Sequence, residues 1–416
     1  MVAPKTGNEK WMWSVVPFYL ALGPLGTLIP IYLLKLGATA ITVGLALTLY
    51  NALTIPASII WGIVVDITAW RKKLIVISYG GSAALLALLY MARNALSVAA
   101  IYAGIGFFSA AASTPINLLI METSEKSRWA SSFSLLNLLA SAGTTAGLVF
   151  ATLYTTLFSP RSMMIFLFIF AASSVATATM AVHDPPITFE RRSLSMHREA
   201  LSSRLVSMPY FFLRIPRPRH FYRFLKERWR TSNPIFPLYV GLFTFYIASG
   251  LFNTMISPGL YKKGLTESQV FTVIMAGYVV QTLSFYIGGR YIERVGETRA
   301  ARLALFLRAG GYIGISASFA ALSATYTLYA SLVLYPLAAG LAFATFYAAS
   351  NVLVFKTLGA HAGSNLGVYS SLVAAATLLG SFISGYTSYY IGYYFTYLLA
   401  GILLLICAKL ISMVYV

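Results

Sequence analysis

Apolar runs of about twenty residues or more follow one another along almost the whole chain, and this feature constrains the fold more than any other. Each run is long enough for a helix to cross the roughly 30 Å hydrocarbon core of a bilayer. Such segments must be helical, because lipid offers no partner to backbone N–H and C=O groups. Only 10% of the residues are charged, against about 25% in soluble domains. An all-α polytopic membrane protein is therefore predicted.

Apolar periodicity and polar breaks predict twelve transmembrane helices in two sets of six. They lie at residues 12–35, 40–65, 74–92, 95–121, 129–154 and 162–183, then 235–257, 268–292, 300–321, 324–355, 364–386 and 393–414. The weakest break falls near Ser323 to Thr327, where little polarity separates two runs. The predicted organisation is an N-terminal six-helix bundle (1–183), a basic cytoplasmic linker (184–233) and a C-terminal six-helix bundle (234–416).

Lysine and arginine are distributed unequally between the two ends of these spans. If the N-terminus and the linker lie on one side, 24 of the 30 Lys and Arg residues fall there and five on the other. Loops rich in Lys and Arg stay in the cytoplasm. We therefore expect a multi-pass protein of the cell membrane with both termini cytoplasmic. This topology also explains the net charge of +19, so no nucleic-acid partner is expected.

The linker contains a segment with its own pattern, from Arg219 to Arg230. Aromatic and aliphatic side chains share one helical face there, and basic side chains surround them. A basic amphipathic helix of this kind lies on anionic lipid headgroups. An interfacial helix against the bilayer is the interpretation we favour for this part of the linker.

Two of the apolar runs end in the same pattern of a glycine, an acid four residues later, and then cations. Each junction closes the second run of its set of six, and the two acids, Asp66 and Glu293, are 227 residues apart. Six spans and a linker predict a separation near this value. The pattern is typical of a duplicated membrane protein.

These junctions and the twelve-span layout resemble the major facilitator superfamily of transporters. The first junction departs from the family signature, since Ala69 and Trp70 stand where glycine and arginine are usual. The resemblance implies a monomeric secondary transporter with two pseudo-symmetric six-helix bundles, working by rocker-switch alternating access. It implies neither enzymatic activity nor a cofactor or metal.

The resemblance also implies that the junctions form a conformational latch. Asp66 would contact the start of span eleven, and Glu293 the start of span five, when the cytoplasmic side is closed. The alternative is that these residues only end the spans and fix the topology. The candidate latch residues are Gly62, Asp66, Arg71, Lys72, Gly289, Glu293, Arg294 and Gly296.

In this superfamily the substrate cavity lies between the halves, lined mostly by spans one, four, seven and ten. Those spans carry polar residues at helical spacing, which places each set on one face. Small polar residues also mediate ordinary packing between membrane helices, so both interpretations stay open. The candidate cavity residues are Tyr19, Thr27, Ser113, Asn117, Tyr246, Ser249, Asn253, Tyr347, Ser350 and Asn351.

Ionisable residues are almost absent from the spans. All eleven acids lie at span ends, in loops or in the tails, so no buried carboxylate is evident for proton coupling. Arg308 is the one charged residue well inside a span, eight residues after the predicted start at residue 300. Its side chain either extends to the cytoplasmic surface, which we favour, or forms a candidate anion site.

The most consistent function is transport of a small organic solute across the cytoplasmic membrane. A membrane sensor or scaffold that keeps the fold is an alternative that nothing in the sequence excludes. An intramembrane transferase is less consistent, because no clustered carboxylates, metal-ligand spacing or nucleophile triad is found.

Overall fold

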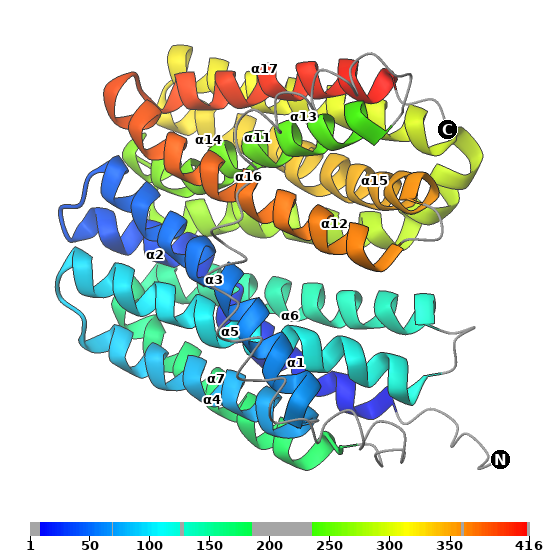
Figure 1. Cartoon of the computed structure of the whole chain (residues 1–416). Coiled ribbons are helices and arrows are strands. Elements are labelled where there is room, and N and C mark those ends of the chain that lie inside the picture. The colour runs from blue at the N-terminus through cyan, green and yellow to red at the C-terminus, as the bar shows by residue number, and fades with distance from the viewer. Residues whose placement is uncertain (1–8, 69, 125–128, 185–234, 359–361, 414–416) are drawn as a thin grey trace, which may run out of the picture.

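The computed structural model describes residues 9–68, 70–124, 129–184, 235–358 and 362–413, and these are almost entirely helical. Figure 1 shows two helical bundles, with the N-terminal one, blue to green, below the C-terminal one, green to red. The N-terminal bundle contains η1 (Glu9–Ser14), α1 (Val15–Leu22), α2 (Leu25–Lys35), α3 (Ala40–Thr68), α4 (Arg71–Met91), α5 (Ala95–Thr123), α6 (Trp129–Leu157) and α7 (Pro160–Ala181). The C-terminal bundle contains α11 (Ile235–Lys262), α12 (Glu267–Val295), α13 (Glu297–Ala321), α14 (Ala324–Tyr335), η3 (Pro336–Ala342), α15 (Phe343–Leu358), α16 (Ala362–Tyr390) and α17 (Tyr393–Ser412).

The predicted spans agree with these helices to within a few residues at each end. The weak break near Ser323 is real, because α13 ends at Ala321 and α14 begins at Ala324. Eleven helical segments of the described residues are long and apolar enough to cross a membrane, and the 29-residue α16 provides the twelfth. The fold-class prediction of twelve helices in two six-helix bundles is confirmed. The expected interfacial helix of the linker lies outside the described residues.

Two spans are interrupted, and a proline lies at each interruption. The first span divides into α1 and α2 at Gly23 and Pro24. The tenth divides into α14 and α15, which are joined by a π-helical segment that begins at Pro336. Proline lacks an N–H and its ring crowds the preceding turn, so it disrupts the regular ladder of a helix. π-helical segments within helices are often found at functional sites.

The two halves repeat each other at the turn after their first span. Gly37 follows α2 with φ of 82°, and Gly264 follows α11 with φ of 104°. L-residues with a side chain rarely adopt this backbone conformation, so glycine is favoured at both turns. Each glycine precedes a threonine hydroxyl that accepts from the N–H three residues later, Thr39 from Thr42 and Thr266 from Gln269, both at 3.3 Å. The next helix therefore starts in the same way in both halves.

Glycine also sets the packing inside each half. A Cβ on Gly147 of α6 would lie 2.3 Å from the carbonyl oxygen of Leu20 in α1. A Cβ on Gly380 of α16 would lie 2.3 Å from that of Ile247 in α11. Membrane helices approach this closely only where small residues allow it. The first and fifth spans of each half are therefore in backbone contact.

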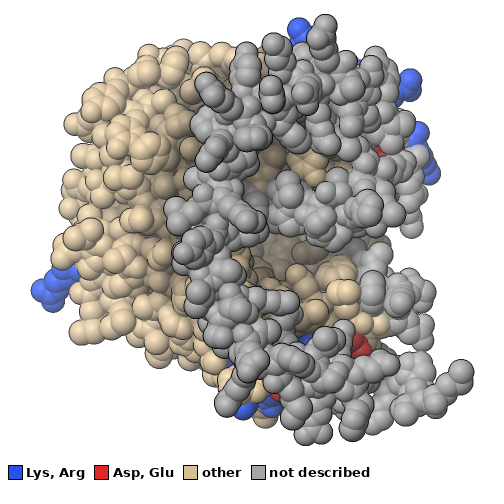
Figure 2. Space-filling view, in the orientation of Figure 1, with Lys and Arg blue, Asp and Glu red and all other residues tan. Residues whose placement is uncertain are grey.

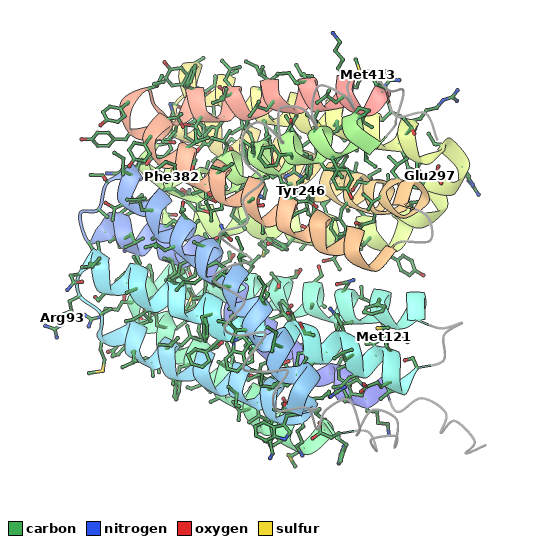
Figure 3. The ribbon with its side chains drawn as sticks, in the orientation of Figure 1. Arg93, Met121, Tyr246, Glu297, Phe382 and Met413 are labelled. Atoms are coloured by element: carbon green, nitrogen blue, oxygen red, sulfur yellow. The ribbon has the colours of Figure 1, made fainter. Side chains whose placement is uncertain are left out.

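The helices place both termini at one end of the molecule, on the right in Figure 1. We call this end the termini face and the opposite end the far face. In Figure 3, Glu297 and Met121 lie towards the termini face and Arg93 lies at the far face. In Figure 2 the Lys and Arg side chains lie at the left edge, at the upper right and along the bottom of the view, and the broad tan surface on the left carries other residue types. This distribution is that of a protein crossing a bilayer.

Candidate functional site: a cavity between the bundles

A cavity of about 400 Å³ lies between the two bundles. Helices of both halves contribute to its wall, including α2, α3 and α5 from the N-terminal half and α11, α12 and α16 from the C-terminal half. Cavities of roughly 300–1,000 Å³ are typical for small-molecule ligands. The polar residues that line this one are Thr27, Tyr50, Asn51, Tyr102, Tyr246, Ser249, Asn253, Thr254, Ser257, Tyr278, Gln281, Arg308, Tyr335, Thr377 and Ser381.

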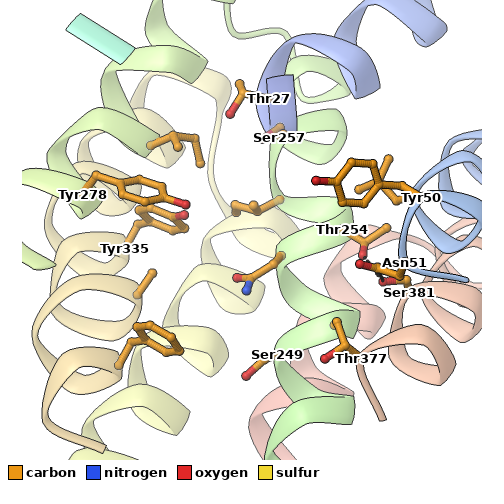
Figure 4. A pocket seen from close by; sticks show the side chains of 18 of the residues that line it. Thr27, Tyr50, Asn51, Ser249, Thr254, Ser257, Tyr278, Tyr335, Thr377 and Ser381 are labelled. Carbon is orange, nitrogen blue, oxygen red and sulfur yellow. Dashed lines mark hydrogen bonds between the residues drawn. The ribbon is translucent and has the colours of Figure 1, made fainter. Parts of the chain in front are cut away.

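Tyrosines form much of the wall. Tyr278 of α12 and Tyr335 of α14 lie side by side with their hydroxyl groups towards the cavity in Figure 4. On the opposite side Tyr50 stacks on Tyr102, with ring centroids 4.5 Å apart. Tyrosine presents an apolar ring and a polar tip. The wall therefore suits a ligand with both a flat or apolar part and hydrogen-bonding groups.

Hydroxyl and amide groups join the two halves across the same cavity. Asn51 Nδ2 of α3 donates to Ser381 Oγ of α16 at 3.4 Å. Ser381 Oγ also accepts from Thr254 Oγ1 of α11 at 2.9 Å, and Figure 4 shows the three side chains together. These contacts lie in the wall of the cavity, so a ligand bound there would be next to the interface between the halves.

A second cavity of about 900 Å³ continues from the first towards the termini face. The two share Tyr278, Gln281 and Phe343. Its lining comes from the termini-face parts of α6, α12 and α15, including Asn137, Tyr286 and Asn351. The two cavities therefore extend from the middle of the molecule into the part of the interface nearer the termini face.

The far face is closed by contacts between the halves. Lys35, at the end of α2, forms an ion pair with Glu267, at the start of α12. Ser268 Oγ donates to the carbonyl oxygen of Thr152 in α6 at 3.0 Å. Gly44 of α3 lies against Gly385 of α16. A Cβ on Gly44 would be only 2.7 Å from the Cα of Gly385. These three contacts close the interface at the far face.

The junctions lie at the termini face, and their described contacts stay within one half. Arg71 Nη2 donates to Glu122 Oε1 of α5 at 2.8 Å, and the Lys72 N–H donates to Asp184 Oδ1 at 2.7 Å. Arg71, Lys72 and Glu122 belong to the N-terminal half, and Asp184 follows shortly after its last helix, α7. The side chains of Asp66 and Glu293, and the environment of Gly289, lie outside the described part of the chain, so the latch stays a prediction.

The remaining junction residues have local explanations. Gly296 has φ of 86° and forms the whole connection between α12 and α13. A backbone of this kind favours glycine. Arg294, in the last turn of α12, is exposed, and a Cβ on Gly62 of α3 would meet nothing within 4 Å. The turn explains why residue 296 is glycine. No contact in this conformation explains why residue 62 is glycine.

The structure distributes the ten candidate cavity residues unequally. Seven line one of the two cavities and three line neither. In the first cavity are Thr27, Tyr246, Ser249 and Asn253; in the second are Tyr19, Tyr347 and Asn351. Ser113, Asn117 and Ser350 are outside both linings. The hydroxyl groups of Ser113 and Ser350 donate to carbonyl oxygens three residues back, at 3.0 and 3.1 Å, so each caps its own helix turn.

Several lining residues come from spans that the sequence did not single out. Tyr50 and Asn51 belong to span two, Tyr278 and Gln281 to span eight, and Thr377 to span eleven. The signal available was a cluster of polar residues well inside each of these apolar runs. Those spans reach the cavity because α3 packs on α16 and α12 packs on α6 across the interface.

Arg308 is buried inside the C-terminal half, and the interpretation that it extends to the membrane surface is wrong. Its side chain is 1% exposed, and it borders the first cavity. Nε donates to Tyr312 Oη at 2.9 Å and Nη2 to Ser249 Oγ at 3.2 Å. The surface interpretation failed because Ser249, which holds the guanidinium, belongs to another span. Among the described residues, no group of three or more His, Cys, Asp or Glu could hold a metal ion.

Comparison with known families decides what this arrangement belongs to. The sequence profile described as Major Facilitator Superfamily matches residues 12–225 and 238–416, which is nearly the whole chain. The chain belongs to the Major Facilitator Superfamily. It is accordingly a polytopic membrane transport protein of the secondary-transporter class and not an enzyme. None of the curated proteins matches the sequence.

Solved structures of superfamily transporters have the same fold at low sequence identity. A mutant of the nucleoside transporter NupG is 15% identical, with a TM-score of 0.69, over 98% of this chain and 99% of that one. A POT family transporter in complex with 5-aminolevulinic acid is 11% identical, with a TM-score of 0.70, over 96% and 94% of the two chains. A bacterial homologue of the human lysosomal transporter Spinster, in an inward-facing and occupied conformation, is 12% identical, with a TM-score of 0.66, over 97% and 95%.

Proposed function

We propose that this superfamily member moves a small organic solute by rocker-switch alternating access, with the cavity between the bundles as its binding site. One observation carries the proposal: the cavity wall is built from both halves, so a rotation of one half against the other changes access to it. The two halves also meet through hydroxyl pairs such as Ser141 and Thr282, 2.6 Å apart. Contacts of this kind can exchange partners at little cost when helices shift.

The conformation described is the one open at the termini face. The position of the second cavity supports this, as do the far-face contacts of Lys35 with Glu267 and of Gly44 with Gly385. The distribution of lysine and arginine supports a cytoplasmic termini face. The protein then faces inward in this state, and the latch of Asp66 and Glu293 belongs to the opposite state, in which the termini face is closed.

The described linings of the two cavities offer no carboxylate for a proton relay. Among the described residues that line the two cavities, none is Asp, Glu or His. Intramembrane proton relays use these side chains. Uniport, or exchange of one solute for another, is supported better than proton symport.

Reversible locking of the far face tests the proposal. The native Cys407 is fully buried, so a Lys35→Cys and Glu267→Cys variant gives two reactive thiols at the far face. A short bifunctional thiol reagent should join the halves and stop solute counterflow in proteoliposomes, and a reductant should restore it. Alternating access requires these positions to separate in each cycle.

A matched pair within one half provides the control. Tyr90 of α4 and Arg161 of α7 lie within the N-terminal half, with the guanidinium carbon of Arg161 5.2 Å from the Tyr90 ring centre, and neither side chain is buried. The same cross-link at Tyr90→Cys and Arg161→Cys should form and leave counterflow unchanged. Undiminished flux through the Lys35–Glu267 cross-link would contradict alternating access. Ligand binding without flux in the uncross-linked protein would instead favour the sensor alternative.

A further inference from the structure

Among the described residues, Arg308, a cation in the membrane interior, has no charged partner. The two ion pairs found among the described residues join Lys35 to Glu267 and Arg71 to Glu122, and neither involves Arg308. An ionised side chain removed from water is stable only when opposite charge or good hydrogen bonds replace its hydration. A buried arginine that is left without an anion is costly to keep.

Neutral groups hold the guanidinium in place. Its carbon lies 5.0 Å from the ring centres of Phe245 and Phe343 and 5.2 Å from that of Tyr312. Aromatic faces attract a cation and so offset part of the lost hydration. Tyr312 is itself fixed, because it stacks on Phe252 with ring centroids 3.6 Å apart. The side chain is therefore positioned before any ligand arrives.

The guanidinium also has donors to spare. Of its five N–H groups, one on Nε goes to Tyr312 and one on Nη2 goes to Ser249, and Nη1 has no partner. Nη1 and the remaining N–H of Nη2 form the end of the guanidinium that binds a carboxylate through two parallel bonds. An unpartnered donor pair on a buried cation at a cavity wall is the geometry of an anion subsite.

The rest of the described cavity lining is uncharged. Arg308 is the only charged residue among the described residues that line it. Asn253, Gln281 and the tyrosine hydroxyls supply neutral donors and acceptors, while the rings supply flat surfaces. A ligand that matches this wall has one negative group and a neutral body.

We propose that Arg308 is the anion-binding residue of the central cavity and that the substrate is a small organic acid, bound through its carboxylate. The carboxylate replaces Ser249 Oγ, whose 3.2 Å bond to Nη2 is the longer of the two, because a charge-assisted bond is stronger. The aromatic or hydroxylated body of the acid lies among the tyrosines. This inference rests on the proposed function of the cavity as the substrate site.

Thermal-shift measurements on the purified full-length protein test the site with matched probes. Salicylate and gluconate should raise the melting temperature of the wild-type protein, whereas salicylamide and gluconamide should not. Arg308→Met keeps a long apolar side chain and should lose the shift in melting temperature. Arg308→Lys should bind the acids at least tenfold more weakly, because an ammonium lacks the paired N–H donors of a guanidinium. Arg302→Met, an exposed position on the same helix, should respond like the wild type.

The ligand-free variants separate binding from a purely structural role. Replacing a buried ionic group by an apolar side chain is often neutral or stabilising, so ligand-free Arg308→Met should melt at or above the wild-type temperature. A lower melting temperature, with the salicylate or gluconate shift retained in Arg308→Lys at wild-type strength, would overturn the proposal. The proposal would also be overturned if each acid and its amide raised the melting temperature equally, or if neither acid raised it. A larger shift with phenyl phosphate than with either acid would overturn the assignment to a carboxylate.

Counterflow measurements separate a failure of the proposed anion site from a failure of the proposed transport function. If an acid binds through Arg308 but no counterflow occurs in proteoliposomes, the anion site stands and the proposed transport fails. If salicylamide or gluconamide flows at the same rate through the wild type and Arg308→Met, transport stands and the anion site fails.

Discussion

The two ends of the interface between the bundles differ in where their contacts go. At the far face, Gly44 lies against Gly385 and Lys35 pairs with Glu267, so the contacts join opposite halves. At the termini face, Arg71 pairs with Glu122 of its own half. The far-face contacts thus connect the two halves, whereas the described ion pair at the termini face connects two helices of the same half.

Under the proposed alternating access, this difference indicates which contacts are exchanged during transport. Backbone contact through two glycines is available only when the far face is closed, because separation of α3 from α16 removes it. A junction that pairs within its half is free to move as part of a rigid bundle. The far-face contacts therefore favour the described state, and the predicted latch of the junction acids would favour the opposite one. Opposing substitutions at the two ends should shift the equilibrium in opposite directions.

The largest effect is expected from Gly44→Val. Its side chain would enter space held by Gly385, with the Cα and N of that residue 2.7 and 3.0 Å from the new Cβ. Overpacking of this kind costs about 1–3 kcal/mol, which corresponds to a roughly 5- to 150-fold loss of the far-face-closed state relative to the open one. Labelling of Asn137→Cys, in the second cavity, from the termini face should slow accordingly.

Gly80→Val is the matched control for this substitution. It lies in α4, and a Cβ there would meet nothing within 4 Å, so labelling and transport should stay at wild-type levels. If Gly44→Val labelled Asn137→Cys at the wild-type rate and transported normally, the glycine contact would not be part of the closure.

Asp66→Asn should act in the opposite direction. The predicted latch holds the termini face closed through the Asp66 charge and the free N–H groups at the start of α16, which begins at Ala362. Removing that charge should leave insertion and melting temperature unchanged, increase labelling of Asn137→Cys, and slow counterflow by about tenfold, an energy of about 1.4 kcal/mol. Unchanged counterflow in vesicles would show that Asp66 ends a span and fixes topology only.

The sequence predicted the helices more completely than the cavity, for a physical reason. A bilayer requires each span to be long and apolar, so breaks such as the one before Ala324 are visible in one dimension. Which face of a helix meets the partner half depends on packing between distant spans. Tyr50 and Gln281 could not be assigned to the cavity without that packing, because polar residues inside a span also serve helix contacts.

The environment of Arg308 also could not be predicted from the sequence. Its place near the start of a span is compatible with a side chain that extends to the surface, and the spacing along α13 does not decide the matter. Phe245 and Ser249 of α11 and Phe343 of α15 form the surroundings that bury it. Sequence separations of about 35 to 63 residues connect these groups to Arg308, and only tertiary structure brings them together.

The smallest expected effect concerns the ion pair at the far face. The side chains of Lys35 and Glu267 are 34% and 19% exposed, and partly exposed pairs contribute about 0.2–1 kcal/mol. Lys35→Gln should therefore lower labelling of Asn137→Cys by less than about fivefold, and Glu267→Gln should do the same. In a double-mutant cycle the second substitution should add little, because the pair is already broken. Additive effects, or effects that persist when high salt screens the charges, would mean that Lys35 and Glu267 act separately and that the glycine contact alone closes the far face.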